Sequence, residues 1–154
     1  MTGRGGRVLG VDLGSRRIGL AASDPSGILA SPHATLTRGS SVDDDHGAIL
    51  AAARALGATR IVVGLPRSLS GDLGPAARGV LAEIEALQAR ARPEGVEVDT
   101  YDERFTTMIA QRNLRDATPR RNRRRRARRD DIDASAAAVI LQSWLDARRA
   151  GPPG

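Results

Sequence analysis

The first third of the chain alternates short apolar runs with turn residues, a pattern typical of consecutive β-strands. The apolar runs are Arg7–Leu13, Ile18–Ala21 and Gly27–Leu36, and Gly14-Ser15 supplies a tight turn between the first two. Pro32 interrupts the third run, and because proline lacks the N–H that a central strand uses, we expect an edge or a bend there. The pattern predicts an antiparallel meander of three strands.

Helical spacing of apolar residues follows the meander. Ile49, Leu50, Ala53 and Leu56 share one helical face, and the preceding Asp43–Asp45 suit the cap and the dipole of a helix N-terminus. Gly57 ends this helix. Three more helices are expected, over Pro75–Ala91, Met108–Leu114 and Asp130–Arg148.

Two further strands are expected at Arg60–Val63 and Val96–Tyr101. The first of these is apolar throughout, as in a central strand that is covered on both faces. It runs into the glycine-rich segment Gly64–Gly74, which is either a phosphate-binding loop or a flexible connection. The order of elements predicts an α/β fold whose mixed five-stranded sheet combines the antiparallel meander with two parallel strands and has helices on both faces.

The domain organisation follows from length and composition. A chain of 154 residues makes one domain, which we place at residues 7–147. Residues 1–6 and 148–154 are expected to be disordered, and a flexible arginine-rich loop is expected at about residues 116–130.

Composition excludes several classes of site. The chain has no cysteine, which rules out disulfides and thiolate zinc sites, and its two histidines are too few for a histidine-rich metal site. No apolar run approaches the ~20 residues of a membrane span, and the N-terminus lacks the apolar core of a signal peptide. We therefore expect a cytoplasmic protein without a membrane partner.

The positive charge is concentrated in Arg120–Arg129. Without the eight arginines of this segment, the 24 basic residues of the chain would no longer outnumber its 18 acidic ones. Such a block suits phosphate contact; the alternative is a solvated, disordered loop. The predicted phosphate-contacting residues in it are Arg120, Arg121, Arg123, Arg124, Arg125, Arg126, Arg128 and Arg129.

Three acids stand at the ends of separate predicted elements. Asp12 lies among the apolar residues of the first strand, Glu103 follows the last strand, and Asp133 begins the last helix. Each also has a structural interpretation: Asp12 can bond to the adjacent turn, Glu103 can form exposed ion pairs, and Asp133 can favour the helix dipole. Carboxylates in a chain with few histidines and no cysteine suit Mg²⁺ or Mn²⁺.

The position of Asp133 on the last predicted helix determines whether its carboxylate can face the sheet. Its predicted buried stripe is Ile132, Ala136, Val139, Ile140 and Ser143, with Asp130 or Asp131 as the N-cap. Asp133 lies seven residues before Ile140 and eleven before Trp144, so it projects over the same side of the helix. The pattern is compatible with an acid directed at the sheet.

Four segments in this order resemble the YqgF/RuvX family of ribonuclease-H-like proteins: GVDLGSRRIGLA, VVGLP…GDLG, DERFTT and IDASAAAVILQSWL. The resemblance covers about Arg7 to Leu145. It implies the ribonuclease-H-like fold and a metal-dependent nuclease that matures the 5′ end of pre-16S rRNA. It also implies catalytic, metal-holding acids at Asp12, Glu103 and Asp133 and nucleic-acid contacts from Arg17 and Arg104. The arginine content of 120–129 exceeds what we expect of this family.

Other functions remain open at this point. A resolvase of four-way DNA junctions needs two sites on opposed strands, hence a stable dimer, whereas we expect a monomer or weak homodimer. A non-catalytic RNA-binding factor of ribosome assembly would need none of the three acids. An ATPase of the actin and hexokinase type is suggested by DLGSRRIG, but that architecture uses two such domains and this chain has one.

Overall fold

The computed structural model describes residues 6–14, 16–65, 75–102 and 125–150. Several predicted features lie outside these residues: the helix Met108–Leu114, most of the Gly64–Gly74 segment, Glu103, Arg104, and the arginines at 120, 121, 123 and 124. The elements in chain order are β1 (Arg7–Leu13), β2 (Arg17–Ser23), β3 (Ala30–Thr37), α1 (Val42–Leu56), β4 (Ala58–Leu65), α2 (Pro75–Ala91), the 3₁₀ helix η2 (Arg92–Glu94), β5 (Glu97–Asp102) and α4 (Arg125–Ala150).

The strands form one five-stranded sheet in the order β3-β2-β1-β4-β5. The pairs β1–β2 and β2–β3 are antiparallel, and the pairs β1–β4 and β4–β5 are parallel. Pro32 lies in the edge strand β3, and the register of that strand shifts next to it. The predicted meander, the two parallel strands and the edge position of Pro32 are confirmed.

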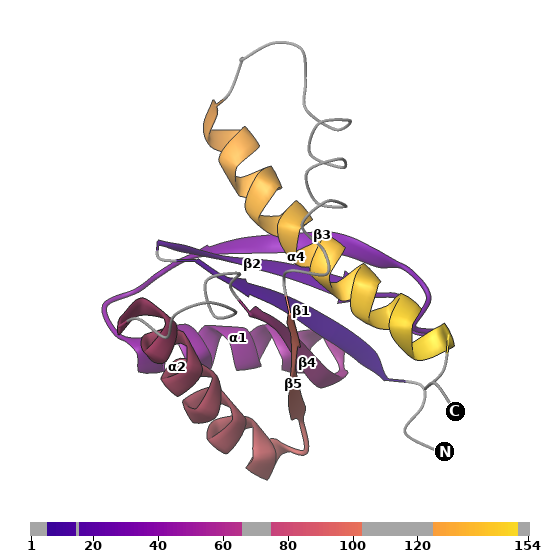
Figure 1. Cartoon of the computed structure of the whole chain (residues 1–154), viewed down its shortest axis with the longest axis horizontal. Helices are drawn as coiled ribbons and strands as arrows, with labels where there is room; N and C mark the ends of the chain where they lie inside the picture. The colour runs from indigo at the N-terminus through magenta and orange to yellow at the C-terminus, as the bar shows by residue number, and fades with distance from the viewer. Residues whose placement is uncertain (1–5, 15, 66–74, 103–124, 151–154) are drawn as a thin grey trace.

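Helices cover both faces of the sheet, so that α1 and α2 lie opposite α4 (Figure 1). In β1, Leu9 and Val11 point into the core shared with α1 and α2, whereas Val8 points toward α4. β4 is covered on both sides in the same way, because Ile61 and Val62 belong to opposite cores. The prediction of a central strand at Arg60–Val63 is therefore confirmed.

The start of α1 differs from the prediction. The Ser41 hydroxyl caps the helix by accepting a hydrogen bond from the Asp44 N–H at 3.1 Å. The three aspartates follow within the first turn, where they favour the helix dipole. Serine caps as well as aspartate does, and it lies one residue ahead of the helix, so the aspartates are not the cap.

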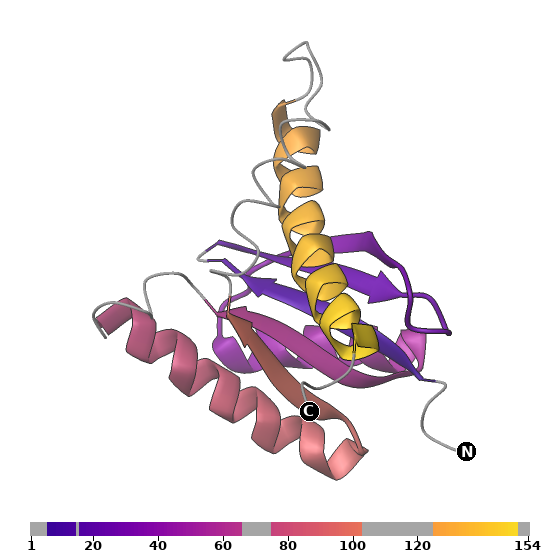
Figure 2. The same cartoon turned by 45° about the vertical axis from the view of Figure 1, so that its right-hand side comes forward.

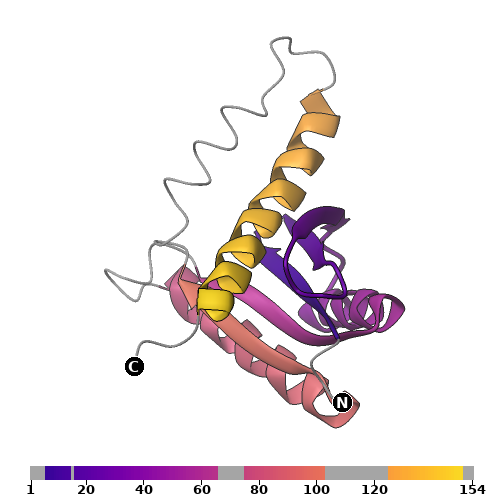
Figure 3. The ribbon, with the colours of Figure 1, turned by 90° about the vertical axis from the view of Figure 1, so that its right-hand side faces the viewer.

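The start of α4 also differs from the prediction. The helix begins at Arg125, so neither Asp130 nor Asp131 is its N-cap, and Asp133 is not in its first turn. The first turns of α4 extend beyond the sheet (Figures 2 and 3). At its other end the helix continues to Ala150, into the segment expected to be disordered.

The buried stripe of α4 matches the predicted one only in part. Val139 and Ile140 are buried as predicted, Ala136 and Ser143 are only half-buried, and the side chain of Ile132 lies outside the described residues. The other buried residues of the helix are Ala134, Ala137, Leu141, Trp144 and Leu145. Trp144 is flanked by two guanidinium groups, Arg60 at 5.7 Å and Arg148 at 4.6 Å from the ring centre. Within the described residues, no helix combines the length and the apolar character that crossing a membrane requires.

Candidate active site

Asp12 lies on the α4 face of the sheet, one residue before β1 ends. Its strand neighbours Val11 and Leu13 pack toward α1 and α2, and side chains alternate along a strand. Asp12 is half-buried there and pairs with Gly19 of β2 in the sheet register. Any group that rests over Gly19 therefore lies beside Asp12.

Asp133 of α4 is the residue that rests over Gly19. A Cβ atom on Gly19 would lie only 2.0 Å from the Asp133 carbonyl oxygen. The helix backbone thus occupies the space of a side chain at this point of β2. The structure brings Asp12 and Asp133, which are 121 positions apart in the sequence, to the same place on the sheet.

Two more glycines allow α4 to approach closely. A Cβ on Gly10 of β1 would lie 2.8 Å from the Leu141 Cβ, and one on Gly64 of β4 would lie 2.5 Å from the Ile140 Cδ1. Together with Gly19, they form a side-chain-free strip under the helix. The strip sets the depth of α4, and hence the height of Asp133 above the sheet.

Arg17 joins this pair of acids. It opens β2, and its Nε donates a hydrogen bond to Asp133 Oδ2 at 2.6 Å. The exposed fractions are 32% for the Arg17 side chain and 26% for Asp133, so the ion pair remains open to solvent. Both residues are predicted from the sequence to belong to the site, but their contact with each other is not.

The remaining predicted site residues are not brought together with this group by the described structure. Glu103 directly follows β5 in the chain, and it lies outside the described residues together with Arg104. The first turns of α4, which precede Asp133 and extend past the sheet, contain Arg125, Arg126, Arg128 and Arg129. Among the described residues, no group of three or more acids or histidines is arranged so that it could hold a metal ion.

The donor chemistry of this place fits a hard divalent cation. Asp12 and Asp133 offer carboxylate oxygens on one face of the sheet, and Mg²⁺ is bound in proteins by one or two carboxylates together with water and substrate phosphates. Since the Arg17 contact uses Asp133 Oδ2, Oδ1 of the same carboxylate is the oxygen outside that ion pair.

A second polar cluster, which the sequence analysis missed, lies on the opposite face. Arg38, directly after β3, contacts Asp45 of α1 and Glu83 of α2. Hydrogen bonding to Glu83 raises the pKa of the Arg38 guanidinium above its ordinary value. His46 is 1% exposed, and its Nε2 lies 3.2 Å from Glu83 Oε2. A signal was present, because His46 shares the helical face of Ile49, Leu50 and Ala53.

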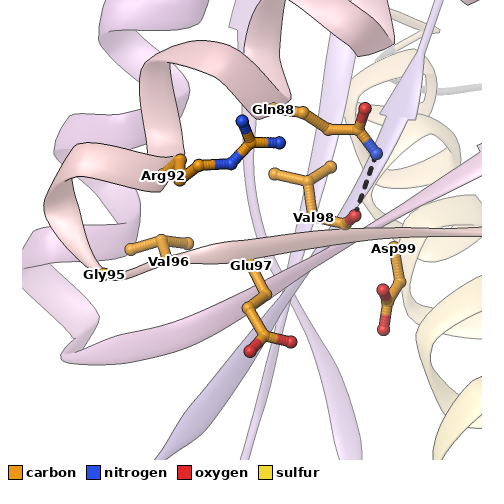
Figure 4. A pocket seen from close by; sticks show the side chains of 7 residues that line it. All are labelled: Gln88, Arg92, Gly95, Val96, Glu97, Val98 and Asp99. Carbon is orange, nitrogen blue, oxygen red and sulfur yellow. Dashed lines mark hydrogen bonds between the residues drawn. The ribbon is translucent and has the colours of Figure 1, made fainter.

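A groove of about 470 Å³ lies elsewhere, beside the first half of β5. The Gln88 side chain crosses it and donates a hydrogen bond to the Val98 carbonyl at 3.2 Å (Figure 4). This amide closes part of the edge of β5. The groove lies on the α2 side, away from the strand ends that carry Asp12; its lining residues are Gln88, Arg92, Gly95, Val96, Glu97, Val98 and Asp99.

Solved structures with a similar fold include two junction resolvases. RuvC of Thermus thermophilus in complex with a Holliday junction substrate has a TM-score of 0.58 at 16% identity, over 93% of this chain and 95% of that chain. The yeast mitochondrial Holliday junction resolvase Ydc2 has a TM-score of 0.58 at 14% identity, over 92% of this chain and 78% of that chain. At these identities the likeness is one of fold, and it confirms the predicted ribonuclease-H-like architecture.

Relatives in mycobacteria are much closer in sequence. A protein of Mycobacterium sp. (strain KMS) is 47% identical over 145 residues, which are 94% of this chain and 82% of the relative. One of Mycobacterium tuberculosis (strain ATCC 25177 / H37Ra) is 46% identical over 150 residues, 97% of this chain and 84% of the relative. Both carry the name "Putative pre-16S rRNA nuclease". The RuvX family, described as Holliday junction resolvase, matches residues 6–147, and the chain therefore belongs to the RuvX family.

Proposed function

We propose that this protein is a metal-dependent nuclease that hydrolyses phosphodiester bonds in structured RNA, with the precursor of 16S rRNA as its substrate. The observation that carries the proposal is that Asp133 lies over Gly19, the residue that pairs with Asp12 in the sheet, close to the end of β1. Family membership and the names of the mycobacterial relatives support the same reaction.

Asp12, Asp133 and Glu103 are the residues that we assign to hold Mg²⁺ or Mn²⁺. A cation of this kind activates water and stabilises the leaving oxygen in phosphodiester hydrolysis. Asp12 contributes an acid fixed by the β1 backbone, and Asp133 contributes one fixed by a helix that rests on the glycine strip. Rigid elements on both sides hold the carboxylates at a set separation, which a catalytic site requires.

Arginines are assigned to hold the substrate. Arg17 lies within the acid group and can donate to a phosphate oxygen with the nitrogens that do not contact Asp133. Arg104 and the arginines of Arg120–Arg129 supply further phosphate contacts along the RNA. Because α4 extends past the sheet from Asp133 toward Arg125, its arginines lie along one direction from the acids.

Cleavage of a four-way DNA junction is the second candidate. The RuvX family is described as Holliday junction resolvase, and the T. thermophilus protein of similar fold is bound to such a junction. We favour RNA because the sequence is far closer to the mycobacterial relatives, and because we expect a monomer or weak homodimer. An rRNA substrate also places the protein in the cytoplasm.

The test is a cleavage assay with two substrates. Purified protein is incubated with precursor 16S rRNA and with a four-way DNA junction, each with Mg²⁺, with Mn²⁺ and with a chelator. We expect chelator-sensitive cleavage of the RNA by the wild type and strongly reduced cleavage by Asp12→Asn. Cleavage of the junction alone would support the resolvase, and binding of RNA without cleavage would support an assembly factor.

A further inference from the structure

We propose that Arg38 is a positioning residue for the active site. Its guanidinium is held by buried acids of α1 and α2, and it fixes the turn that separates Asp12 from Arg17. The effect of Arg38 on the active site rests on the proposed nuclease function. The contacts from which we infer it lie on the other face of the sheet, where α1 and α2 pack.

Arg38 contacts the β1–β2 turn at two points. Its backbone N–H donates to the Arg16 carbonyl oxygen at 2.9 Å, and its Nε donates to the Gly14 carbonyl oxygen at 2.9 Å. The turn is also closed by the Gly14 N–H, which donates to the Arg17 carbonyl at 3.0 Å. One residue thus binds a carbonyl on each side of the turn.

The other end of the guanidinium is bound by two helices. Its Nη1 and Nη2 donate to the two carboxylate oxygens of Glu83 at 2.6 and 3.2 Å, and Nη1 also donates to Asp45 Oδ2 at 3.2 Å. Asp45 Oδ1 accepts a hydrogen bond from the Gly39 N–H at 2.7 Å. The exposed fractions are 6% for Asp45 and 10% for Glu83, so both acids are withdrawn from water.

Burial of these charges calls for an explanation beyond stability. Replacing a buried ion pair with apolar residues of similar volume is often neutral or stabilising, since the charges must be desolvated. What an apolar cluster cannot supply is a planar fork with donors aimed at three elements at once. Here the fork joins the carboxylates of α1 and α2 to the Gly14 carbonyl.

The turn is held from both faces of the sheet. Arg38 holds it from the α1 and α2 side, while Arg17 at its far end binds Asp133 of α4 at 2.6 Å. Asp12 lies two residues before Gly14, so motion of the turn moves Asp12 and Arg17 together. Loss of the Arg38 fork is therefore expected to loosen the acid group without removing any member of it.

The test compares Arg38→Lys with a matched control, Arg90→Lys. A lysine ammonium carries all its donors on one nitrogen, so it cannot donate to the Gly14 carbonyl and to both carboxylates at once. Arg90 joins the same two helices, since its Nη1 donates to the Asp43 carbonyl at 2.7 Å and to Asp43 Oδ1 at 3.0 Å, but it contacts no residue of the turn in the described structure. Glu83→Gln serves as a second variant if Arg38→Lys does not fold.

Three readouts are needed. Amide hydrogen exchange of Gly14 reports the turn, exchange of Val62 in the central strand reports global stability, and Mn²⁺ titration reports the acid group without requiring turnover. In Arg38→Lys we expect Gly14 exchange to become about tenfold faster relative to Val62, and Mn²⁺ to bind about tenfold more weakly, as for loss of one hydrogen bond to a charged group. The Arg90→Lys control should match the wild type.

Each outcome of these measurements either supports or overturns the role of Arg38. If Arg38→Lys accelerates amide exchange at Gly14 and Val62 equally, the Arg38 cluster stabilises the whole fold and the inference is overturned. Faster exchange at Gly14 with unchanged Mn²⁺ affinity would overturn it as well, because the turn would then not position the acids. If the wild type neither binds Mn²⁺ nor cleaves RNA, the proposed function fails. The exchange of Gly14 then still shows whether Arg38 fixes the turn.

Discussion

The Arg17 Nε lies 2.6 Å from Asp133 Oδ2, which joins the start of β2 to α4 beside Asp12. The same carboxylate is one that we assign to the metal site. An arginine that neutralises a metal-binding acid competes with the cation for it, and also places a phosphate-binding group next to the reaction centre. This relationship makes the effects of changing Arg17 on metal and on substrate opposite in sign.

We predict that Arg17→Gln strengthens Mn²⁺ binding several-fold and weakens RNA binding. Removing the guanidinium removes the positive charge that opposes a cation at Asp133. It also removes one phosphate contact, so the slope of log affinity against log salt should flatten by about 0.7–0.9. Calorimetric Mn²⁺ titration and RNA binding at several salt concentrations measure the two effects. Weaker Mn²⁺ binding would instead show that Arg17 serves mainly to orient Asp133.

Asp12→Asn is predicted to lower metal-dependent cleavage by about 100-fold or more. The amide keeps the shape of the side chain but deletes a charge that holds the cation, and metal catalysis supplies several kcal/mol of charge stabilisation, at 1.36 kcal/mol for each factor of ten. Thermal melting should stay close to that of the wild type. Undiminished RNA cleavage by this variant would assign the activity to another site or to a contaminant.

Gly19→Ala is predicted to destabilise the fold by roughly 1–3 kcal/mol, the usual cost of overpacking, and to impair cleavage. Its Cβ would lie 2.0 Å from the Asp133 carbonyl oxygen, so α4 must shift and carry Asp133 with it. Gly79→Ala in α2 is the control, because in the described structure nothing beyond its own chain neighbours and the nearby helix backbone lies within 4 Å of its Cβ position. That change should stabilise the protein by about 0.5–1 kcal/mol. Denaturant unfolding of both variants measures the contrast.

Much of the fold could be predicted because its signals are local. The apolar run Arg7–Leu13 and the Gly14-Ser15 turn predict the first hairpin, and the apolar residues Ile61, Val62 and Val63 predict a strand that is covered on both faces. The helical face of Ile49, Leu50 and Ala53 likewise identifies the buried side of α1. Asp133 was placed correctly on the sheet side of α4 by its spacing from Ile140 and Trp144.

Features that depend on distant residues could not be predicted in the same way. Arg38 reads as part of a polar loop, and only the packing of α1 and α2 shows that Glu83 reaches it. The close approach of α4 depends on glycines from three strands, and no local pattern distinguishes these from turn glycines. The arginines at the start of α4 carry no apolar periodicity, so the helix was predicted to begin only at Asp130.

The β2–β3 hairpin provides a pH-dependent prediction. Hydrogen bonds from the Leu29 N–H, the Ser26 hydroxyl and the Ile28 N–H hold the pKa of Asp24 well below its ordinary value of 3.8. A carboxyl whose pKa is lowered by folding stabilises the native state above its unfolded pKa, and this contribution is lost as the pH falls through the folded value.

We therefore expect Asp24→Asn to lower the melting temperature at pH 7 and to have a smaller effect at pH 3. Asparagine keeps one carbonyl acceptor for the two backbone N–H groups, so the difference between its effects on the melting temperature at pH 7 and at pH 3 reports the charge of the Asp24 carboxylate. Asp146→Asn is a suitable comparison, since Asp146 is exposed and accepts a hydrogen bond from Gln142 at 3.0 Å. A loss that stayed constant between pH 3 and pH 7 would contradict the assignment to the Asp24 carboxylate.

The arginine segment yields the last prediction, and the structure divides it into two matched halves. Arg125, Arg126, Arg128 and Arg129 lie in α4, while Arg120, Arg121, Arg123 and Arg124 precede the helix in the chain. Each half carries four arginines, so replacing either set with glutamine removes the same charge. Glutamine is chosen because its helix propensity is close to that of arginine, which leaves α4 intact.

If all four arginines of a set contact phosphate, either replacement should flatten the slope of log RNA affinity against log salt by about three units, at ~0.7 for each single-strand contact and ~0.9 for each duplex contact. Stability should hardly change, because α4 packs on the sheet from Asp133 onward. If only the α4 set flattens the slope, the RNA follows the helix that extends from the acids. An unchanged slope in both variants, or a melting temperature many degrees lower, would show that the arginines serve the packed structure rather than the RNA.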